Sequence, residues 1–194
     1  MNTSFSTLQD IISSRRTIKP DQMNGQKIDE SKIDDLVQLA DWAPTHGRTE
    51  PWRFYTYSAD KVALFCKDHA DLYRSHTAEE NFQQGTYDKL LHMGDQASHV
   101  LVAVMKRGDN PKIPVLEEIA ASSAAIQNLL LGAEALGIAA YWGSGGMAYK
   151  PAMKSYLQLA EEDTVLGVLY LGYSDAPAKA GTRKTPAATK LIRM

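Results

Sequence analysis

The chain has 194 residues, of which 44% are hydrophobic and 23% are charged, and its formal net charge at pH 7 is −2. This length can build one well-buried core, so we expect a single domain over residues 1–194. The weak negative charge and the absence of a Lys/Arg-rich block argue against nucleic acid and against a membrane surface as partners. The first residues lack the pattern of a signal peptide, and no apolar run approaches the roughly 20 residues of a spanning helix, so a cytoplasmic protein is predicted.

The cysteine and histidine pattern does not predict a metal site. Cys66 is the only cysteine, which excludes an internal disulfide and a site with several thiolates. His69 and His76 are seven residues apart, as are His92 and His99, and this spacing of two helical turns is too long for both to bind one ion. We expect Cys66 to pack as a small apolar residue.

The N-terminal sequence predicts a helix followed by a basic segment. The helix is expected to be capped by Ser6 or Thr7 and to end within residues 13–16. If the following segment is extended, Arg15, Thr17 and Lys19 point to one side. A guanidinium, a hydroxyl and an ammonium on one side suit an anion, since Arg can bind phosphate through two hydrogen bonds. The alternative is a solvated basic helix end, which the helix dipole favours.

A second helix is expected to be capped by Asp29 and to stop near Trp42, because Pro44 disfavours helical geometry in the residue before it. Residues 42–54 then combine two prolines, a glycine, two tryptophans and several side-chain donors, and they lead into a strand over residues 53–57. Loops of this composition are often functional sites. A rigid connection whose tryptophan fills the core would have the same composition, and both interpretations stay open.

The middle of the chain predicts a helix, a polar excursion and a strand. Ser58 is expected to cap the helix, which continues to Leu72. Residues 75–99 are polar and contain two glycines, which predicts a helical excursion able to act as a lid. The β-branched run over residues 100–105 predicts a buried strand.

The most apolar helical pattern of the chain begins at residue 117 and predicts a buried helix that ends at Gly137. A short strand over residues 138–142 and a glycine-rich loop over residues 143–146 are expected to follow. The uncovered amides of such a loop can hold a polar ring or an anionic group. A simple glycine-rich turn is the alternative.

The C-terminal part predicts a helix from residue 150, a strong strand over residues 165–173, and an arm over residues 174–194. The arm is rich in Ala, Pro and Lys and cannot form a core, so we expect it to pack on a partner subunit. Strands are fewer than helices and do not alternate with them regularly, which favours an α+β fold over a doubly wound one.

Three separated motifs occur together in this chain. They are Arg15-Arg16-Thr17, the run from Ala43-Pro44-Thr45-His46 to Glu50-Pro51-Trp52-Arg53-Phe54, and Tyr141-Trp142-Gly143-Ser144-Gly145. In this order and spacing the sequence resembles the nitroreductase family of FMN flavoproteins, the short bacterial members in particular, over about residues 8–183. The resemblance implies a nitroreductase-like α+β sandwich with a mainly antiparallel central sheet flanked by helices. It also implies an intertwined homodimer with FMN at the interface.

The resemblance implies that four residues of the basic segment each contact FMN. Arg15 and Thr17 would hold the phosphate, Arg16 would lie against the ribityl chain, and Lys19 would lie near the flavin N1 and O2. A late basic pair, Arg183 with Lys184, resembles the second phosphate contact of the family.

Two further segments are implied to contact the flavin. The Pro-Thr-His segment would come from the other subunit and bring His46 and Trp42 to the cofactor. The glycine loop would lie on the ring with an amide aimed at N5, and it consists of Trp142, Gly143, Ser144 and Gly145. This chain departs from the family where Arg48 and Glu50 replace the usual Asn and Gln, so the usual amide donor to the pyrimidine edge is absent. The alternatives for Arg48 are to donate there instead, which would add positive charge, or to turn to solvent.

The implied activity is an NAD(P)H oxidoreductase in which hydride passes from NADH or NADPH to N5 of FMN and then to an electron-poor acceptor, such as a nitroaromatic or a quinone. The flavin carries the chemistry, so we name no catalytic side chain. The alternatives are a flavin-binding module or reservoir without a small-molecule substrate, and another flavin reaction such as dehalogenation, enone reduction or flavin breakdown.

Overall fold

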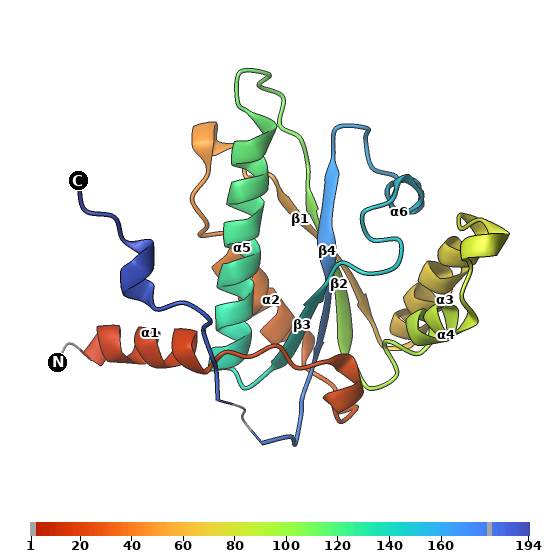
Figure 1. Cartoon of the computed structure of the whole chain (residues 1–194), viewed down its shortest axis with the longest axis horizontal. Helices are drawn as coiled ribbons and strands as arrows, with labels where there is room; N and C mark the ends of the chain where they lie inside the picture. The colour runs from red at the N-terminus through yellow and green to blue at the C-terminus, as the bar shows by residue number, and fades with distance from the viewer. Residues whose placement is uncertain (1–2, 178–179) are drawn as a thin grey trace.

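The computed structural model describes residues 3–177 and 180–194 (Figure 1). The helices and strands follow one another as α1 (Thr3–Ser14), α2 (Glu30–Ala40), β1 (Trp52–Ser58), α3 (Asp60–Ser75), α4 (Gln84–Leu91), β2 (His99–Met105), α5 (Val115–Ala135), β3 (Ala139–Gly143), α6 (Pro151–Tyr156) and β4 (Thr164–Gly172). Short 3₁₀ helices are η1 (Pro20–Gln22), η2 (His46–Arg48), η3 (Glu79–Asn81) and η4 (Ala187–Lys190). Within the described ranges, the helices are too short or too polar to cross a membrane.

The strands form one antiparallel sheet in the order β1-β2-β4-β3. A β-bulge interrupts the pairing of β2 with β4, because Ala103 lies opposite Gly167 whereas Val104 lies opposite Val165. Leu166 is therefore left out of the pairing with β2. The antiparallel sheet between helices confirms the α+β fold predicted from the sequence.

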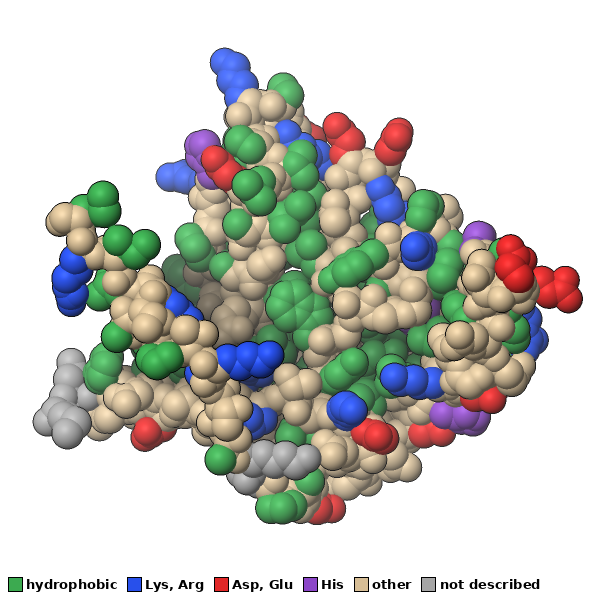
Figure 2. All heavy atoms as spheres, viewed as in Figure 1, with side chains coloured by type: hydrophobic (Ala, Val, Ile, Leu, Met, Phe, Trp, Pro, Cys, Tyr) green, Lys and Arg blue, Asp and Glu red, His purple; other side chains and the backbone are tan. Residues whose placement is uncertain are grey.

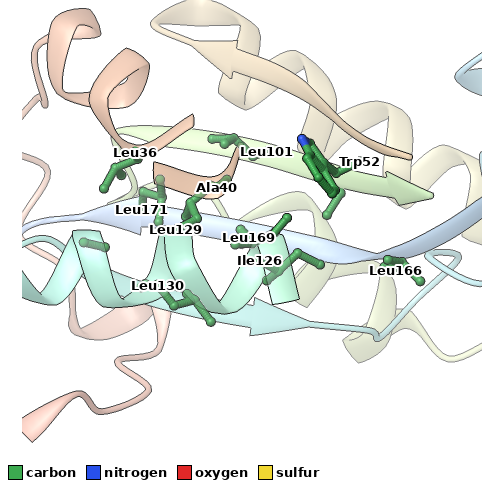
Figure 3. Packing of buried hydrophobic residues seen from close by; sticks show 14 of the residues in the cluster. Leu36, Ala40, Trp52, Leu101, Ile126, Leu129, Leu130, Leu166, Leu169 and Leu171 are labelled. Carbon is green, nitrogen blue, oxygen red and sulfur yellow. The ribbon is translucent and has the colours of Figure 1, made fainter. Parts of the chain in front are cut away.

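Helices cover both faces of the sheet, and each face has its own core (Figure 1). On one face α2 and α5 pack against the strands, and Leu36, Leu101, Ile126, Leu129 and Leu169 are almost completely buried there (Figure 3). On the other face α3 and α6 cover a second cluster that includes the only cysteine, which packs as an apolar residue as predicted. Burying one such aliphatic side chain contributes about 1.5–3 kcal/mol of stability. A helix that is buried on most sides, such as α5, is therefore apolar on most sides.

Two helix starts differ from the sequence-based expectation. The first helix starts at Thr3, and the hydroxyls of Ser6 and Thr7 donate to the Thr3 carbonyl, at 3.1 and 2.9 Å, instead of capping the helix. The third helix begins after Ala59, and Ser58 is the last residue of β1. In both cases a polar residue near the boundary predicted a cap that the local backbone does not use. The strands and α5 lie within two residues of their predicted ranges.

The N-terminal helix and the C-terminal arm extend away from the body formed by the sheet and the helices on its two faces (Figure 1). No residue of α1 is buried, and Phe5 is 64% and Leu8 51% exposed. The arm over residues 180–194 is exposed throughout, including Leu191 and Ile192. Figure 2 shows further apolar side chains on the face that α5 presents between the arm and the body. A twelve-residue helix that buries nothing is marginal in water, so one chain leaves these elements without the packing that would stabilise them.

Candidate functional site

The glycine-rich loop follows β3 and packs on an aromatic ring. A Cβ added at Gly143 would lie 2.5 Å from Cε1 of Tyr141, so a side chain there would have to displace that ring. A Cβ at Gly145 would meet nothing within 4 Å. Both glycines border a cavity of about 160 Å³ whose wall also contains Tyr141 and Lys89. The loop thus turns backbone without side-chain cover toward a concave surface.

A second cavity of about 290 Å³ continues the first. It contains Lys19, which is exposed, together with Asp21. Lys89, Met93 and Tyr141 line both cavities, so one concave surface runs from Lys19 to the glycine loop. The helix α4, inside the excursion predicted over residues 75–99, supplies one wall of this surface. Its action as a lid stays a prediction.

The basic segment reaches this surface because it runs beside β3. Thr17 forms an isolated parallel bridge with Ala140, and the Ile18 N–H donates to the Ala140 carbonyl at 3.0 Å. The segment is therefore extended, as predicted, and it delivers Lys19 to the neighbourhood of the next β3 residue. The arginine before Thr17, Arg16, is half-buried beside the C-terminal end of α5, where it shares a groove with Glu134.

Three other basic residues lie close to this groove. Arg15 is half-buried at the end of α1. The backbone at Gly181 lies against the guanidinium of Arg16, so the C-terminal arm brings Arg183, which is exposed, and Lys184 into the same region. The predicted phosphate contacts of the basic segment and of the arm thus lie near the C-terminal end of α5, beside the extended segment that leads to Lys19.

His46, in the same loop as Trp42 and Arg48, lies at the opposite end of α5 from the basic segment. His46 Nδ1 lies 2.5 Å from Oε2 of Glu117 in the first turn of that helix. The rise from Glu117 to Glu134 is roughly 26 Å at about 1.5 Å per residue. One chain therefore does not bring both groups of predicted site residues to one small molecule. Trp42 is 86% exposed, and its contact with a cofactor of another subunit stays a prediction.

The segment after Trp42 contains the core-filling tryptophan of one of the two interpretations left open by the sequence, and its role as a functional site stays a prediction. Trp52 is buried and its Nε1 donates to Oδ1 of Asp41 at 3.0 Å, so this tryptophan fills the core. Arg48 and Glu50 have positive φ angles of 56° and 43°, a conformation that costs residues with a side chain some energy. The part of the loop that departs from the family pattern is therefore also its strained part.

His69 forms part of the cavity wall, and its pKa is strongly perturbed. Burial lowers the pKa of His69 from 6.5 to about 4, because a charged imidazolium loses its hydration there. Its Nε2 accepts the Met147 N–H at 2.9 Å, so the neutral ring carries its proton on Nδ1. That Nδ1 has no protein partner among the described residues.

The side chain of Trp142 does not line either cavity. Its Nε1 donates to the Leu166 carbonyl at 3.0 Å, on the same side of β3 as Ala140, which belongs to the α5 core. Ser144 is exposed and is likewise outside the cavity lining. The aromatic residue that faces the cavities is the preceding one, Tyr141.

Sequence reasoning missed Tyr141, His69, Lys89 and Met93 as site residues. The alternation of β3 could have indicated Tyr141, because neighbouring strand residues face opposite sides. Among the residues that the structure covers, no cluster of three or more His, Cys, Asp or Glu side chains could hold a metal ion.

The sequence model of the nitroreductase family matches residues 12–173. The chain belongs to the nitroreductase family. This confirms the family, and with it the oxidoreductase class, predicted from the three motifs. The chain is 28% identical over 194 residues to YfhC of Bacillus subtilis strain 168, provisionally named an NAD(P)H nitroreductase, and the match covers 97% of this chain and 95% of YfhC. It is 22% identical over 141 residues to YdjA of Escherichia coli K12, which carries the same provisional name, with 73% and 75% covered.

Solved nitroreductase structures have the same fold. A nitroreductase-like family protein from Bacillus cereus superposes with a TM-score of 0.79 at 26% identity, covering 96% of this chain and 95% of the other. A nitroreductase with bound FMN from Bacteroides fragilis has a TM-score of 0.72 at 18% identity, covering 96% and 98%. These superpositions agree with the predicted nitroreductase-like sandwich.

Proposed function

We propose that the protein is an FMN-dependent NAD(P)H oxidoreductase that delivers electrons to flat, electron-poor acceptors such as nitroaromatics or quinones. The observation that carries the proposal is the continuous concave surface from Lys19 through Tyr141 to the glycine loop. The family membership and the FMN-containing relatives of the same fold support it.

The residues of this surface suit the parts of FMN. Uncovered amides at Gly143 and Gly145 can donate to the polar edge of a flavin ring, and Tyr141 offers an aromatic wall. Lys19 and Lys89 provide cations on the same concave surface. His69 also lines the cavity, and its buried Nδ1 donor has no hydrogen-bond partner among the described residues.

The basic residues near the C-terminal end of α5 suit the phosphate. Arg15, Arg16 and Thr17 lead directly to Lys19 along β3, and Arg183 follows the part of the arm that contacts Arg16. A guanidinium binds phosphate through two hydrogen bonds and keeps its charge at any physiological pH. These side chains would therefore fix the cofactor's position.

When bound, FMN supplies hydride acceptance from the nicotinamide and electron delivery to the acceptor. The protein's task is electrostatic and geometric. Lys19 would stabilise the extra negative charge of the reduced cofactor, because a cation interacts more strongly with the more negative state. Leu90 and Met93 give the cavity an apolar wall that keeps water away from the reacting face.

A second copy of the chain would complete the site. The separation of His46 from Arg16 along α5 means that Trp42, His46 and Arg48 reach a cofactor only across a dimer interface. The exposed apolar residues of α1 and the arm suit this interface, since obligate interfaces are large and apolar. The arm over residues 174–194 would then pack on the partner subunit, apart from residues 178–179, which lie outside the described residues.

The test is an absorption spectrum of the purified protein followed by a steady-state assay. We expect a yellow protein that releases FMN on denaturation and oxidises NADH or NADPH faster when a nitroaromatic or a quinone is added. A colourless protein that takes up no added FMN would contradict the cofactor assignment. A flavoprotein that oxidises neither nicotinamide with any acceptor would instead be a flavin carrier.

A further inference from the structure

The glycine loop is held in place from both of its ends by groups outside it. Before the loop, Trp142 Nε1 donates to the Leu166 carbonyl at 3.0 Å. After the loop, the Met147 N–H donates to Nε2 of His69 at 2.9 Å, and the Tyr149 hydroxyl donates to the same Leu166 carbonyl at 3.3 Å.

The Leu166 carbonyl can hold both rings because of the bulge in β4. Leu166 lies outside the register between β2 and β4, so the indole of Trp142 and the phenol of Tyr149 both find an acceptor there. Next to it, Gly167 has a φ of 139°, and a Cβ there would lie 2.8 Å from the Gly143 carbonyl. The bulge and the start of the loop are therefore packed as one unit.

The histidine end of the loop is as closely packed as the bulge end. His69 is 3% exposed, and its ring packs against Phe65 with centroids 5.7 Å apart. Gly146 has a φ of 62°, and a Cβ there would lie only 2.6 Å from His69 Nε2. The backbone can approach the imidazole this closely because residue 146 is a glycine. Nothing else in the described part of the chain accepts the Met147 N–H.

We propose that His69 is a positioning residue that fixes the glycine loop over the cavity, so that the loop amides are aimed before any cofactor binds. An amide already held in place requires no reorganisation when negative charge develops near it, which is the general basis of electrostatic preorganisation. The proposal rests on the proposed function for its consequence, the tuning of a bound flavin. The fixed loop itself is a property of the chain without cofactor.

The burial of His69 keeps its ring neutral, which is the state that can accept a hydrogen bond at Nε2. A glutamine at this position can place its amide oxygen where Nε2 lies, whereas the shorter asparagine reaches only the position of Nδ1. A leucine keeps the apolar bulk but accepts nothing. Comparing these three variants, His69→Gln, His69→Asn and His69→Leu, distinguishes the loss of the hydrogen-bond acceptor at Nε2 from a change in side-chain volume.

The first measurement is amide hydrogen exchange of the FMN-free protein. In His69→Leu and His69→Asn we expect the Met147 amide to exchange about tenfold faster than in the parent, because one hydrogen bond that holds it is lost. Peptides from β4 should exchange at the parental rate, which reports that the fold is intact. His69→Gln should restore protection at Met147, and His76→Gln, at an exposed histidine outside both cavities, should change nothing.

The second measurement is the midpoint potential of bound FMN. We expect His69→Leu and His69→Asn to shift the potential and His69→Gln to keep the parental value. Unchanged exchange at Met147 in His69→Leu and His69→Asn, or equal exchange in the Gln and Asn variants, would overturn the positioning role. If the parent binds no FMN, the proposed function fails while the exchange result still decides whether His69 fixes the loop.

Discussion

The buried histidine makes the stability of the protein depend on pH in a defined direction. Burial holds the pKa of His69 at about 4, whereas the ring titrates at 6.5 when it is unperturbed. A proton therefore binds the unfolded chain more readily than the folded one between these values. The stability contributed by the neutral ring is fully present above about pH 6.5 and is lost as the pH falls toward about 4.

The size of this loss follows from the two pKa values. One pH unit of difference corresponds to about 1.4 kcal/mol, so the full loss below both values is roughly 3 kcal/mol. At about pH 5 roughly 2 kcal/mol of it is already gone. This is a large fraction of the 5–15 kcal/mol by which domains are typically stable.

Urea denaturation of the FMN-free protein, followed by circular dichroism at one protein concentration, measures this loss. The comparison is between the parent and His69→Gln, at about pH 7.5 and about pH 5. All other titrating groups are shared, so the difference between the two pH dependences isolates the histidine. We expect the parent to lose roughly 2 kcal/mol more than the variant. Equal losses in the two proteins would refute the conclusion that His69 is neutral and buried in the folded state.

Three further predictions concern the cofactor contacts, the strained loop and the arm. Lys19→Met should lower the midpoint potential of bound FMN, because it removes a cation near the reduced ring, whereas Arg15→Ala should mainly weaken FMN binding, since the phosphate charge does not change on reduction. Arg48→Asn should stabilise the FMN-free protein by about 1 kcal/mol, because asparagine tolerates a positive φ better. Truncation after Asp175 should weaken both dimerisation and FMN binding.

Each of these has its own measurement. Spectroelectrochemical titration reads the potential, and an unchanged value in Lys19→Met would show that the ammonium does not face the ring. Thermal unfolding measures the stability change caused by Arg48→Asn in the strained loop. Ala59→Gly is its control, because φ there is 49° at a position away from both cavities. No stabilisation in Arg48→Asn alongside stabilisation in Ala59→Gly would indicate that contacts of Arg48 offset its strain. Sedimentation velocity measures the dimerisation of the protein truncated after Asp175. If that protein is still a dimer, the arm does not belong to the interface.

Much of the fold could be predicted because its elements have strong periodicity. The strands β2 and β4 are uninterrupted apolar runs, and α5 is apolar on nearly all sides, so burial alone fixes their type and approximate ends. Helix starts were predicted less well. A hydroxyl such as that of Ser6 can cap a helix or bond back to the preceding turn, and the sequence does not distinguish the two.

The site was predicted in part. The site residues that were not predicted, such as Tyr141 and His69, share one physical reason. The motif residues Thr17 and Lys19 lie beside β3, as their extended spacing suggested. The choice of Tyr141 over Trp142 as the cavity-facing ring depends on which side of the sheet is hollow, and only tertiary packing decides that. His69 likewise acquires its role from a backbone N–H far away in the sequence. No local pattern could have indicated that contact.

The dimer was predicted from the family resemblance and from the composition of the C-terminal arm, and the structure of the single chain adds two observations that bear on it. α1 buries no residue, and the predicted site residues are separated by most of the length of α5. Both observations are what a dimer with a shared site would produce in a single chain. The intertwined homodimer with a shared cofactor stays a prediction until the assembly is measured.

The central claim is that each FMN binds between the basic segment of one chain, which contains Arg15, and the loop of the neighbouring chain that contains His46. Its most direct test is a mixed-dimer experiment that combines subunits carrying Arg15→Ala with subunits carrying His46→Ala. In such a heterodimer the account predicts one intact site and one site that lacks both residues, so about half of the parental FMN should be bound. If both groups instead served a cofactor within one chain, each site would lack one residue, and FMN occupancy would match that of the single-variant homodimers.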